Sequence, residues 1–598
     1  MNEQKRSRIF LLCLLALTVV VYVGTLQFGF IYDDHQVLEQ NPMVTSWGNL
    51  VANFTDNLWA FAGIKSAYYR PVFADLWIVL YHLFGLNPIG WHLVNVLLHA
   101  SVTTLVYFLA RRLLAKEVQS AAWMAALLFA LHPVHVETVS WVAASCDLLM
   151  TMFAVSALIC FLRSEDGPSS SWKWKILGAI CFSLSMLSKE PGITTAGMAA
   201  LLIWTKPDIA QPPVSFLNKF RMTTIAMLPW GVLAVLYLLA RRVVLGGSAP
   251  IPPIPPFLQV MQTWPWLLWF YIKKLLWPVE SSAFYDAPYV SQLTWNEFWL
   301  PLIGTLALIT AIVIWMRRVH NPRIGVFALW MLLPILPQWE LRVFSQNDFA
   351  HDRYLYLPSV GFCLLAGLAW SAIADRVNQR GISEVKAFIV TAVLLTAVLA
   401  PLTVLESSNW ANDLVLNSHA VQVAKVYNEE ALTNLGSELM KRQMYDDALK
   451  VYSQVAARKP GWWQAHQNIG LALFMLGRLD EADEVFRKTA LMTNVPRQEP
   501  LLFLGYTRMK AGHYSGAEAA LRSALEEARN EKVGDETKFS IALAACLLEE
   551  GKTDPEKLRE ALPVLQKIHE QNPKDESINK AIKKTEDDLN GAKKKISK

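Results

Sequence analysis

Two adjacent carboxylates, Asp33 and Asp34, follow the first long apolar run of the chain by only a few residues. An ionised carboxylate is costly in free energy close to hydrocarbon, so the position of this pair needs a chemical explanation. Neighbouring acids repel one another when both are charged, so one of them tends to hold a proton, or the pair holds a cation. The pair therefore fits a loop cap, a general base that takes a proton from a hydroxyl group, or part of a metal site.

Three basic side chains, Arg70, Lys189 and Arg353, also lie close to the ends of apolar runs. A guanidinium matches the geometry of phosphate oxygens, and an ammonium supplies a compact positive charge. We predict that these three residues bind a phosphate group. The alternative for each arginine is snorkelling toward lipid headgroups. Lys189 is followed by Glu190, so that pair could instead neutralise itself.

Further ionisable residues complete the predicted site. His135 and Glu137 have the separation of metal ligands, and together with Asp33 and Asp34 they are the candidates for binding a divalent cation, the one cofactor considered. No third ligand follows at a fixed spacing, so a hydrogen-bonded cluster at a helix end is the stronger interpretation. The other residues expected to line the site are His132, His135, Glu137, Asp147, Glu190, His351 and Asp352.

The elements that position these residues differ between the two parts of the chain. Of 598 residues, 53% are hydrophobic, and nearly all long apolar runs lie before residue 406. We predict an all-α protein with a transmembrane domain over 1–405, a linker helix over 406–429, a repeat domain over 430–575 and a basic tail over 576–598. The net charge of +5 is small, so no nucleic-acid partner is expected, and the six cysteines contain no CxxC pair.

The transmembrane domain is predicted to have about eleven spans. They are expected at residues 9–26, 90–110, 119–134, 145–162, 175–188, 191–204, 222–240, 298–316, 323–338, 355–373 and 385–405. If the N-terminus is cytoplasmic, the cytoplasmic loops are basic, with Arg241 and Arg242 as exceptions on the other side. Asp33, Asp34 and the other polar clusters then all fall on the external face.

The second part of the chain repeats itself with a period close to 34 residues. Leu-Gly or Ile-Gly pairs end at Gly436, Gly470 and Gly505, and alanines keep the same spacing. Small residues where two antiparallel helices cross are typical of the tetratricopeptide repeat. We predict three clear repeats and a degenerate fourth over 537–573 that acts as a cap, with a disordered end at 592–598.

These motifs together resemble the transmembrane and tetratricopeptide-repeat-containing O-mannosyltransferases, and more widely the GT-C glycosyltransferases, which include the protein O-mannosyltransferases. The resemblance covers nearly the whole chain. It rests on the order of six motifs, namely Tyr32-Asp33-Asp34, Tyr69-Arg70-Pro71, His92-x-x-Asn95-x-x-x-His99, Leu131-His132-Pro133-Val134-His135-x-Glu137, Ser188-Lys189-Glu190 and Arg353-Tyr354-Leu355-Tyr356-Leu357-Pro358-Ser359.

The resemblance implies an inverting transferase that moves a sugar, mannose in this family, from a polyprenyl-phosphate donor to a hydroxyl acceptor. The acceptor would be Ser or Thr of a protein, and transfer would take place on the non-cytoplasmic face. The family's catalytic acidic residue maps onto Asp33, with Asp34 beside it. The repeats would hold a protein or peptide acceptor near the site. The expected partners are therefore the lipid-linked donor, the acceptor and the bilayer.

Other functions fit parts of the pattern. A non-catalytic membrane-anchored scaffold would use the repeats to recruit partners for envelope or polysaccharide assembly, although an anchor needs no ionisable clusters on one face. A flippase for a lipid-linked sugar would place ionisable residues at mid-span. A polysaccharide or lipid acceptor is a further alternative. The compact loops favour a bacterial inner membrane with extracytoplasmic repeats over the endoplasmic reticulum.

Overall fold

The computed structural model describes residues 3–64, 66–115, 117–166, 171–204, 215–246, 255–344, 348–424, 429–531, 536–573 and 575–596. Throughout these residues the regular structure is helical and none of it is strand, which confirms the all-α prediction. The chain divides into two compact units, Met1–Asn428 and Glu429–Lys598.

Seven helices of the first unit are long and apolar enough to cross a membrane, counted over the described residues. They are α1 (Glu3–Tyr22), α4 (Pro88–Leu113), α7 (Ser145–Ser164), α10 (Phe216–Leu245), α12 (Leu300–Val319), α14 (Pro358–Gln379) and α15 (Glu384–Ser408). An eighth span would be a bent pair of α5 (Gln119–Leu131) and Pro133–Ser140, with an angle of 48° between them. The bend follows from Pro133, because proline cannot continue the helical hydrogen-bond ladder.

Four of the eleven expected spans are therefore not among these seven, and one of the four is the bent pair. Two others are α9 (Thr195–Trp204) and α13 (Arg323–Leu332), which have 10 residues each. α9 rises only about 15 Å, whereas the hydrocarbon core is about 30 Å thick. α13 continues directly into the 3-10 helix Leu333–Trp339, and the two form one shorter apolar helix over Arg323–Trp339. The last, α8 (Ser171–Ser188), is longer but carries Lys173 and Lys175 near its start.

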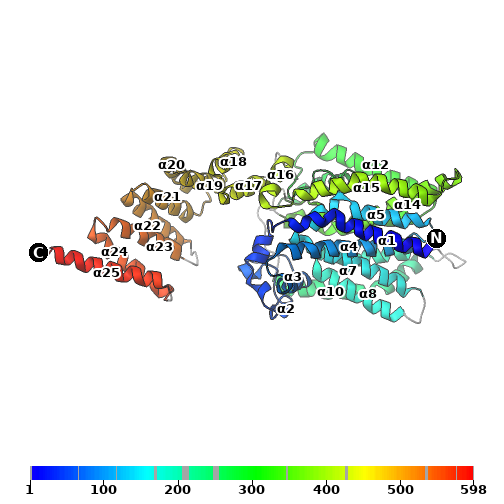
Figure 1. Cartoon of the computed structure of the whole chain (residues 1–598), viewed down its shortest axis with the longest axis horizontal. Helices are drawn as coiled ribbons and strands as arrows, with labels where there is room; N and C mark the ends of the chain where they lie inside the picture. Colours follow the sequence, from blue (N-terminus) through cyan, green and yellow to red (C-terminus); the bar gives the residue numbers. More distant parts are fainter. Residues whose placement is uncertain are drawn as a thin grey trace. The chain divides into compact units, whose positions relative to one another are not determined.

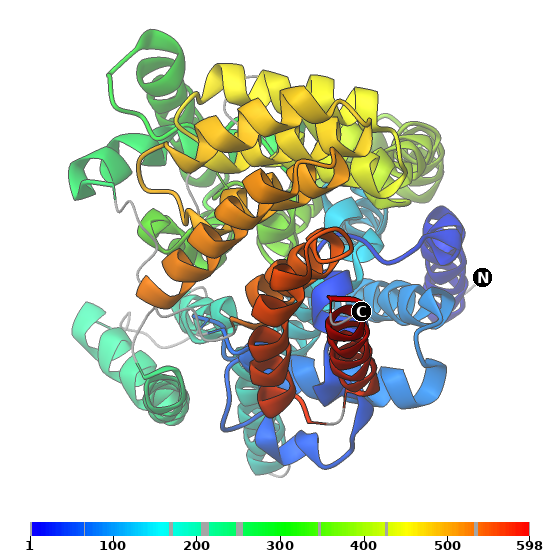
Figure 2. The ribbon, with the colours of Figure 1, turned by 90° about the vertical axis from the view of Figure 1, so that its left-hand side faces the viewer.

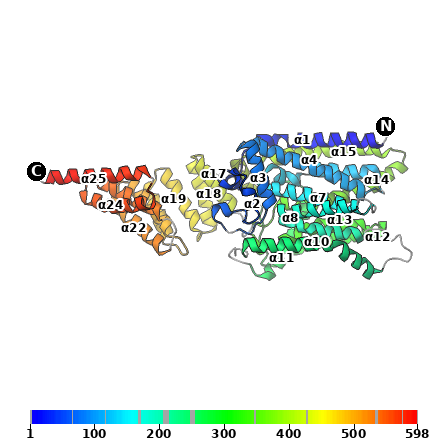
Figure 3. The same cartoon turned by 90° about the horizontal axis from the view of Figure 1, so that it is seen from below.

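Small residues let the helices of the first unit pack closely. α5 packs against α14, where a Cβ added at Gly367 would lie 2.7 Å from the backbone oxygen of Ala121. Such crossings favour van der Waals packing between membrane helices. The apolar stretch of α7 is 72% buried, whereas those of α10 and α12 are each 11% buried. Figure 3 shows α10 and α12 at the edge of the bundle, where their apolar faces suit contact with lipid.

The long helices of the first unit run side by side, so their connections gather at the ends of the bundle (Figure 1). At one end lie the segments after α1, α8 and α15, and those before α7, α14 and α3 (Pro71–Phe84). The residues predicted to form the site all belong to these segments or to the first turn of α7. The helix packing therefore brings them to one end of the membrane unit.

The second unit is an array of helices in which each packs on the next, as Figures 1 and 2 show. A Cβ added at Gly436 would lie 2.5 Å from the Tyr452 ring, and one at Gly470 would lie 2.6 Å from the Phe486 ring. The repeated glycines thus make room for the repeated aromatic rings. The helices are α17 (Glu429–Lys441), α18 (Tyr445–Arg458), α19 (Trp463–Met475), α20 (Leu479–Ala490), α21 (Gln498–Lys510), α22 (Tyr514–Asn530), α23 (Thr537–Glu550), α24 (Pro555–Gln571) and α25 (Glu576–Ile596).

The last helix differs from the expected tail, because residues 576–596 form α25 instead of a charged tail with a disordered end. Ile578 is buried, and Ala581 and Ile582 pack with it in a cluster that includes residues of α24. These apolar residues recur at helical spacing, which stabilises the helix through tertiary packing. The many lysines of the segment concealed this apolar face.

The linker helix expected over 406–429 is divided in the structure. α15 continues to Ser408, and α16 (Asp413–Val423) begins after a short turn. The side chain of Asn412 caps α16 by accepting the backbone N–H of Val415 at 3.1 Å. Residues 425–428 lie outside the described part of the chain.

Candidate active site

A cavity of about 630 Å³ opens where the segments at this end of the membrane unit meet. Its wall takes side chains from the loop after α1, the loop before α3, the start of α7, the turn after α8, the end of α10 and the turn before α14. The predicted site residues that line it are Asp33, Arg70, Asp147, Lys189, Glu190 and Arg353. The fold therefore gathers side chains that lie far apart in the sequence.

The two adjacent acids have different surroundings. Asp34 is fully buried, and its carboxylate accepts the backbone N–H groups of Ile31 at 3.2 Å and of Ala143 at 2.8 Å. Asp33 lines the cavity, and within the described residues no donor is hydrogen-bonded to its carboxylate. Asp34 thus ties the loop after α1 to the turn before α7, while Asp33 presents a free carboxylate to the cavity.

Burial also changes the acidity of both groups. Burial raises the pKa of Asp33 to about 6, and the nearby Arg353 guanidinium opposes that rise. Burial raises the pKa of Asp34 to about 8, although the N–H groups of Ile31 and Ala143 oppose it. Asp33 is therefore the more readily ionised of the two near neutral pH, and it is more basic than an ordinary aspartate.

The first two cations predicted to bind phosphate are each paired with a carboxylate. Arg70 donates to both oxygens of Glu190, with Nη2 at 2.8 Å from Oε2. The Lys189 ammonium lies 2.7 and 2.6 Å from the two oxygens of Asp147, and these side chains are 4% and 3% exposed. Burial alone would raise the pKa of Glu190, but Arg70 outweighs it and the pKa is lowered. Both pairs are therefore ionic, with their charges largely compensated within the wall.

The third cation, Arg353, is held on several sides. Its Nη1 pairs with the carboxylate of Glu137, which also accepts the backbone N–H of Arg353 at 2.9 Å. Its guanidinium lies 5.2 Å from the ring centroid of Trp141 and 5.1 Å from that of Tyr354, within the range of cation–π contacts. Arg353 is thus a fixed positive charge in the cavity wall, and it acts electrostatically on Asp33.

The predicted histidines before α7 are not part of the cavity wall. His132 Nε2 is 2.9 Å from the backbone oxygen of Leu275, and His132 Nδ1 accepts the N–H of Val134. His135 Nε2 lies 2.8 Å from the hydroxyl of Ser359. These contacts stabilise the bend after α5 and the start of α14. The structure thus gives both histidines packing contacts away from Asp33.

His351 and Asp352 are buried behind the wall. Asp352 accepts the hydroxyl of Tyr285 at 2.7 Å. His351 Nδ1 lies 4.0 Å from an oxygen of Glu137. These residues, together with Glu137, support the turn that carries Arg353, and they do not line the cavity.

The residues considered as ligands of a divalent cation do not fit one. The Asp34 carboxylate accepts two backbone N–H groups, the His135 ring is bonded to a serine, and the Glu137 carboxylate is bound by an arginine. The part of the chain that the structure describes contains no group of three or more His, Cys, Asp or Glu side chains arranged to hold a metal ion.

Several wall residues were missed from the sequence. Tyr68 and Trp141 are aromatic residues beside the paired arginines, and Tyr237 and Arg241 come from the end of α10. The Arg70 guanidinium lies 4.5 Å from the ring centroid of Tyr68. Of these four residues, only Arg241 could have been found from the sequence, because it is a basic residue on the side of the membrane where the charge pattern of the loops predicts few.

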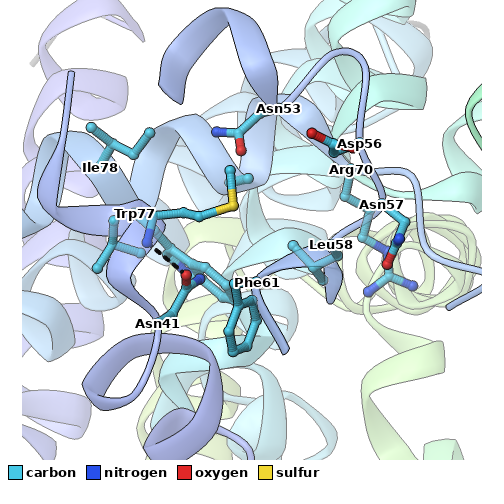
Figure 4. A pocket seen from close by; sticks show the side chains of 12 residues that line it. Asn41, Asn53, Asp56, Asn57, Leu58, Phe61, Arg70, Trp77 and Ile78 are labelled. Atoms are coloured by element: carbon cyan, nitrogen blue, oxygen red, sulfur yellow. Dashed lines mark hydrogen bonds between the residues drawn. The ribbon is translucent and has the colours of Figure 1, made fainter. Parts of the chain in front are cut away.

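A second, smaller pocket adjoins the cavity and shares Leu58, Arg70 and Trp77 with it. Figure 4 shows Asn53 and Asp56 on its wall as well. Its volume is about 20 Å³. A space of that size holds about one water molecule, so of the two spaces it is the larger cavity that has room for a sugar.

Comparison with known proteins supports the resemblance seen in the motifs. Residues 70–232 match the family described as dolichyl-phosphate-mannose-protein mannosyltransferase, and residues 433–496 match the tetratricopeptide repeat. The chain is 26% identical over 510 residues to protein O-mannosyl-transferase TMTC3 of Mus musculus. It is 27% identical over 558 residues to protein O-mannosyl-transferase Tmtc3 of Drosophila melanogaster. The predicted resemblance to the O-mannosyltransferases is confirmed.

The two alignments cover 79% and 81% of this chain, but 53% and 59% of those relatives. The chain therefore spans a little more than half of the length of the relatives it matches. The family match at 70–232 contains Arg70, Asp147, Lys189 and Glu190, whereas Asp33 lies before it. The repeat match at 433–496 covers most of α17 and all of α18 to α20, and it confirms that the second unit contains tetratricopeptide repeats, whereas the predicted third repeat and the degenerate cap lie beyond the match.

Among solved structures, the chain is similar to ArnT from Cupriavidus metallidurans in the apo state. The sequences are 14% identical, and the similarity covers 81% of this chain and 80% of that chain. The TM-score is 0.36, which indicates a remote likeness.

Proposed function

We propose that this chain is a membrane glycosyltransferase that moves a sugar, mannose by resemblance, from a polyprenyl-phosphate donor to the hydroxyl of a protein Ser or Thr. One observation carries the proposal: the unbonded carboxylate of Asp33 faces a cavity in which the acids Asp147 and Glu190 are already paired with cations. A general base needs a free lone pair within reach of the acceptor hydroxyl. The names of the relatives support the sugar and the acceptor.

In the proposed reaction, Asp33 takes the proton from the acceptor hydroxyl while the acceptor oxygen attacks the anomeric carbon. The new carbon–oxygen bond forms on the face opposite the phosphate, and the bond between the anomeric carbon and the phosphate oxygen breaks. The electron pair leaves with the polyprenyl phosphate, so the anomeric configuration inverts. The proton on Asp33 then passes to solvent. Fixed positive groups in the wall stabilise the charge that develops on the phosphate.

The size and lining of the cavity support a sugar substrate. Its volume of about 630 Å³ lies within the usual range of small-molecule sites. Tyr68, Trp141 and Tyr354 present aromatic surface, and the carboxylates of Asp147 and Glu190 supply hydrogen-bond acceptors for sugar hydroxyls. This mixture of aromatic surface and fixed polar groups is typical of sites that orient a small ligand.

The ion pairs refine the role proposed for Arg70, Lys189 and Arg353. Arg70 uses Nε and Nη2 for Glu190, and its Nη1 lies 3.8 Å from the Cys146 sulfur. A guanidinium has five N–H donors, so a paired arginine keeps donors for a ligand. We propose that these cations orient the sugar phosphate through their remaining donors, and that their carboxylate partners hold them in place.

We place the reaction on the non-cytoplasmic face. Basic residues end the helices that run away from the cavity, including Arg112 of α4, Arg163 of α7 and Arg376 of α14. Positive residues favour the cytoplasmic side of a membrane, so the cavity would lie on the opposite side. The repeats follow α15, and they would hold an acceptor protein on that same side.

Purified full-length protein, incubated with labelled polyprenyl-phosphate mannose and Ser- or Thr-containing peptides, tests this function. Asp33→Asn keeps the size of the side chain but removes the base, so we expect transfer to fall by at least about 100-fold. Asp375→Asn is the matched control, because Asp375 is exposed on α14 and does not line the cavity.

Full transfer by a folded Asp33→Asn variant would contradict the role of Asp33. Three results together would replace the enzymatic function by the scaffold function. The wild type would transfer no labelled polyprenyl-phosphate sugar to protein, polysaccharide or lipid acceptors, Asp33→Asn would keep the cellular phenotype, and deletion of the repeats would abolish that phenotype.

A further inference from the structure

Among the described residues of the cavity wall, one arginine has no carboxylate partner. Arg241, near the end of α10, lines the cavity, and within the described residues no carboxylate lies within salt-bridge distance of it. Its Nη2 donates to the backbone oxygen of Ala67 at 2.9 Å, and its Nε is buried without a hydrogen-bond partner. Glu340, an acid on the same wall, is already bound by Arg342 at 2.6 Å. Arg241 therefore lines the cavity, and its buried Nε is a donor that the described structure leaves unsatisfied.

A second unsatisfied donor lies one helical turn away. Tyr237 is 6% exposed, lines the same cavity, and its buried hydroxyl has no hydrogen-bond partner in the described structure. Residues four apart on a helix lie on the same face, so the Tyr237 hydroxyl and the Arg241 guanidinium are neighbours on one wall. A buried donor without a partner is costly, and two of them beside a cavity indicate a ligand that accepts hydrogen bonds.

We propose that Tyr237 and Arg241 form an anion subsite that takes the phosphate of the lipid-linked donor. A guanidinium and a hydroxyl donor together suit the phosphodiester of the bound donor and the phosphate monoester that leaves after transfer. α10 supplies the route, because its apolar stretch is only 11% buried and the rest suits contact with lipid. A polyprenyl chain could then lie along α10 while its phosphate reaches Arg241. The inference rests on the proposed function, and it adds to the three paired cations a fourth contact for the donor phosphate, from an arginine with no carboxylate partner among the described residues.

The subsite also places Asp33 and Arg241 in complementary roles. Each is a charged wall residue without an ionic partner among the described residues, one negative and one positive. A sugar between them would have the acceptor base on one side and the leaving phosphate on the other. The negative charge of Asp33 and the positive charge of Arg241 compensate one another in sign, so the cavity can hold both when no substrate is bound.

Direct binding tests the subsite without any transfer. The probe is farnesyl phosphate, added to the full-length protein in phosphatidylcholine nanodiscs, with farnesol as the uncharged match and inorganic phosphate as the lipid-free match. We expect Arg241→Gln to weaken binding of farnesyl phosphate at least about tenfold, and Tyr237→Phe to weaken it about threefold to tenfold. Arg242→Gln is the matched control, because Arg242 is adjacent, exposed and outside the cavity wall. Farnesol binding should not change in any variant.

Wild-type affinity for farnesyl phosphate in both Arg241→Gln and Tyr237→Phe would overturn the subsite. If Arg241→Gln does not fold, Arg241→Lys and Tyr237→Phe decide the question, and both must weaken binding for the subsite to stand. Equal affinity for inorganic phosphate and farnesyl phosphate would overturn the assignment to a lipid. The binding experiment contains no acceptor, so its result does not depend on the role of Asp33. A full rate of transfer by Asp33→Asn in the separate transfer assay would contradict the catalytic role of Asp33 and would leave the binding result unchanged.

Discussion

The carboxylate of Asp413 binds the loop that carries the candidate base, with one oxygen 2.7 Å from His35 Nε2. Its other oxygen accepts the backbone N–H of Tyr32 at 2.8 Å. Tyr32 has a φ of 52°, a left-handed conformation that is uncommon for residues other than glycine. Asp413 opens α16, so the segment after the last span holds Asp33 in position through the backbone beside it.

Removing this contact should lower activity without touching the cavity. In Asp413→Ala, the N–H of Tyr32 loses its acceptor, and we expect kcat to fall about tenfold with little change in KM for the donor. Asp413→Asn keeps an oxygen acceptor and should recover part of the rate. Glu39→Gln is the control, because Glu39 binds His35 Nδ1 at 2.6 Å but makes no contact with Tyr32. An equal loss of kcat in Asp413→Ala and Glu39→Gln would show that the contacts of His35, and not the bond to the Tyr32 backbone, support the rate.

The pH dependence of transfer should report the acidity of Asp33. The base must be deprotonated to act, and burial raises the pKa of Asp33 to about 6. The rate constant kcat/KM should therefore be nearly constant above pH 7 and fall by about tenfold per pH unit well below pH 6. Asp33 and Asp34 are adjacent, so the profile gives an apparent pKa of the pair. A profile that is flat from pH 5 to pH 8 would contradict a carboxylate base of this acidity.

Breaking one buried ion pair should be costly for stability. Lys189 and Asp147 are both buried, so Lys189→Met leaves an isolated buried carboxylate, and we expect a loss of about 3–5 kcal/mol in the free energy of unfolding. The double variant Lys189→Met with Asp147→Leu removes both charges and should regain most of that loss. Reversible unfolding of the full-length protein in detergent measures the free energy of unfolding of the single and the double variant. Equal destabilisation by the single and double variants would show that packing dominates over the charge.

The close crossing of α17 and α18 can be tested in the repeats. A Cβ at Gly436 would lie 2.5 Å from the Tyr452 ring, so Gly436→Ala should destabilise the unit by about 1–3 kcal/mol. Gly461→Ala is the control, since no atom lies within 4 Å of its added Cβ. Protease sensitivity of the second unit in the full-length protein should rise in Gly436→Ala. An unchanged sensitivity would mean that the ring moves aside at little cost.

Local patterns were enough to predict much of the fold. The apolar runs identified the long helices, and the 34-residue period identified the repeats, because both signals depend only on nearby residues. Local patterns did not reveal which of the predicted spans would be short or bent, since helix length and bending depend on where the chain turns in three dimensions. They also concealed the apolar face of α25, which becomes visible only when Ile578 and Ile582 pack beside α24.

The sequence by itself determined which residue types would gather at one end of the membrane unit, because hydropathy sets where each helix ends and the residues predicted to form the site lie at such ends. Only the tertiary structure decided their roles. The pairings of Arg70 with Glu190 and Arg353 with Glu137 join residues 120 and 216 positions apart. Such contacts depend on how the helices pack, so composition and spacing do not reveal that Asp33 and Arg241 are the charged wall residues without an ionic partner in the described part of the chain.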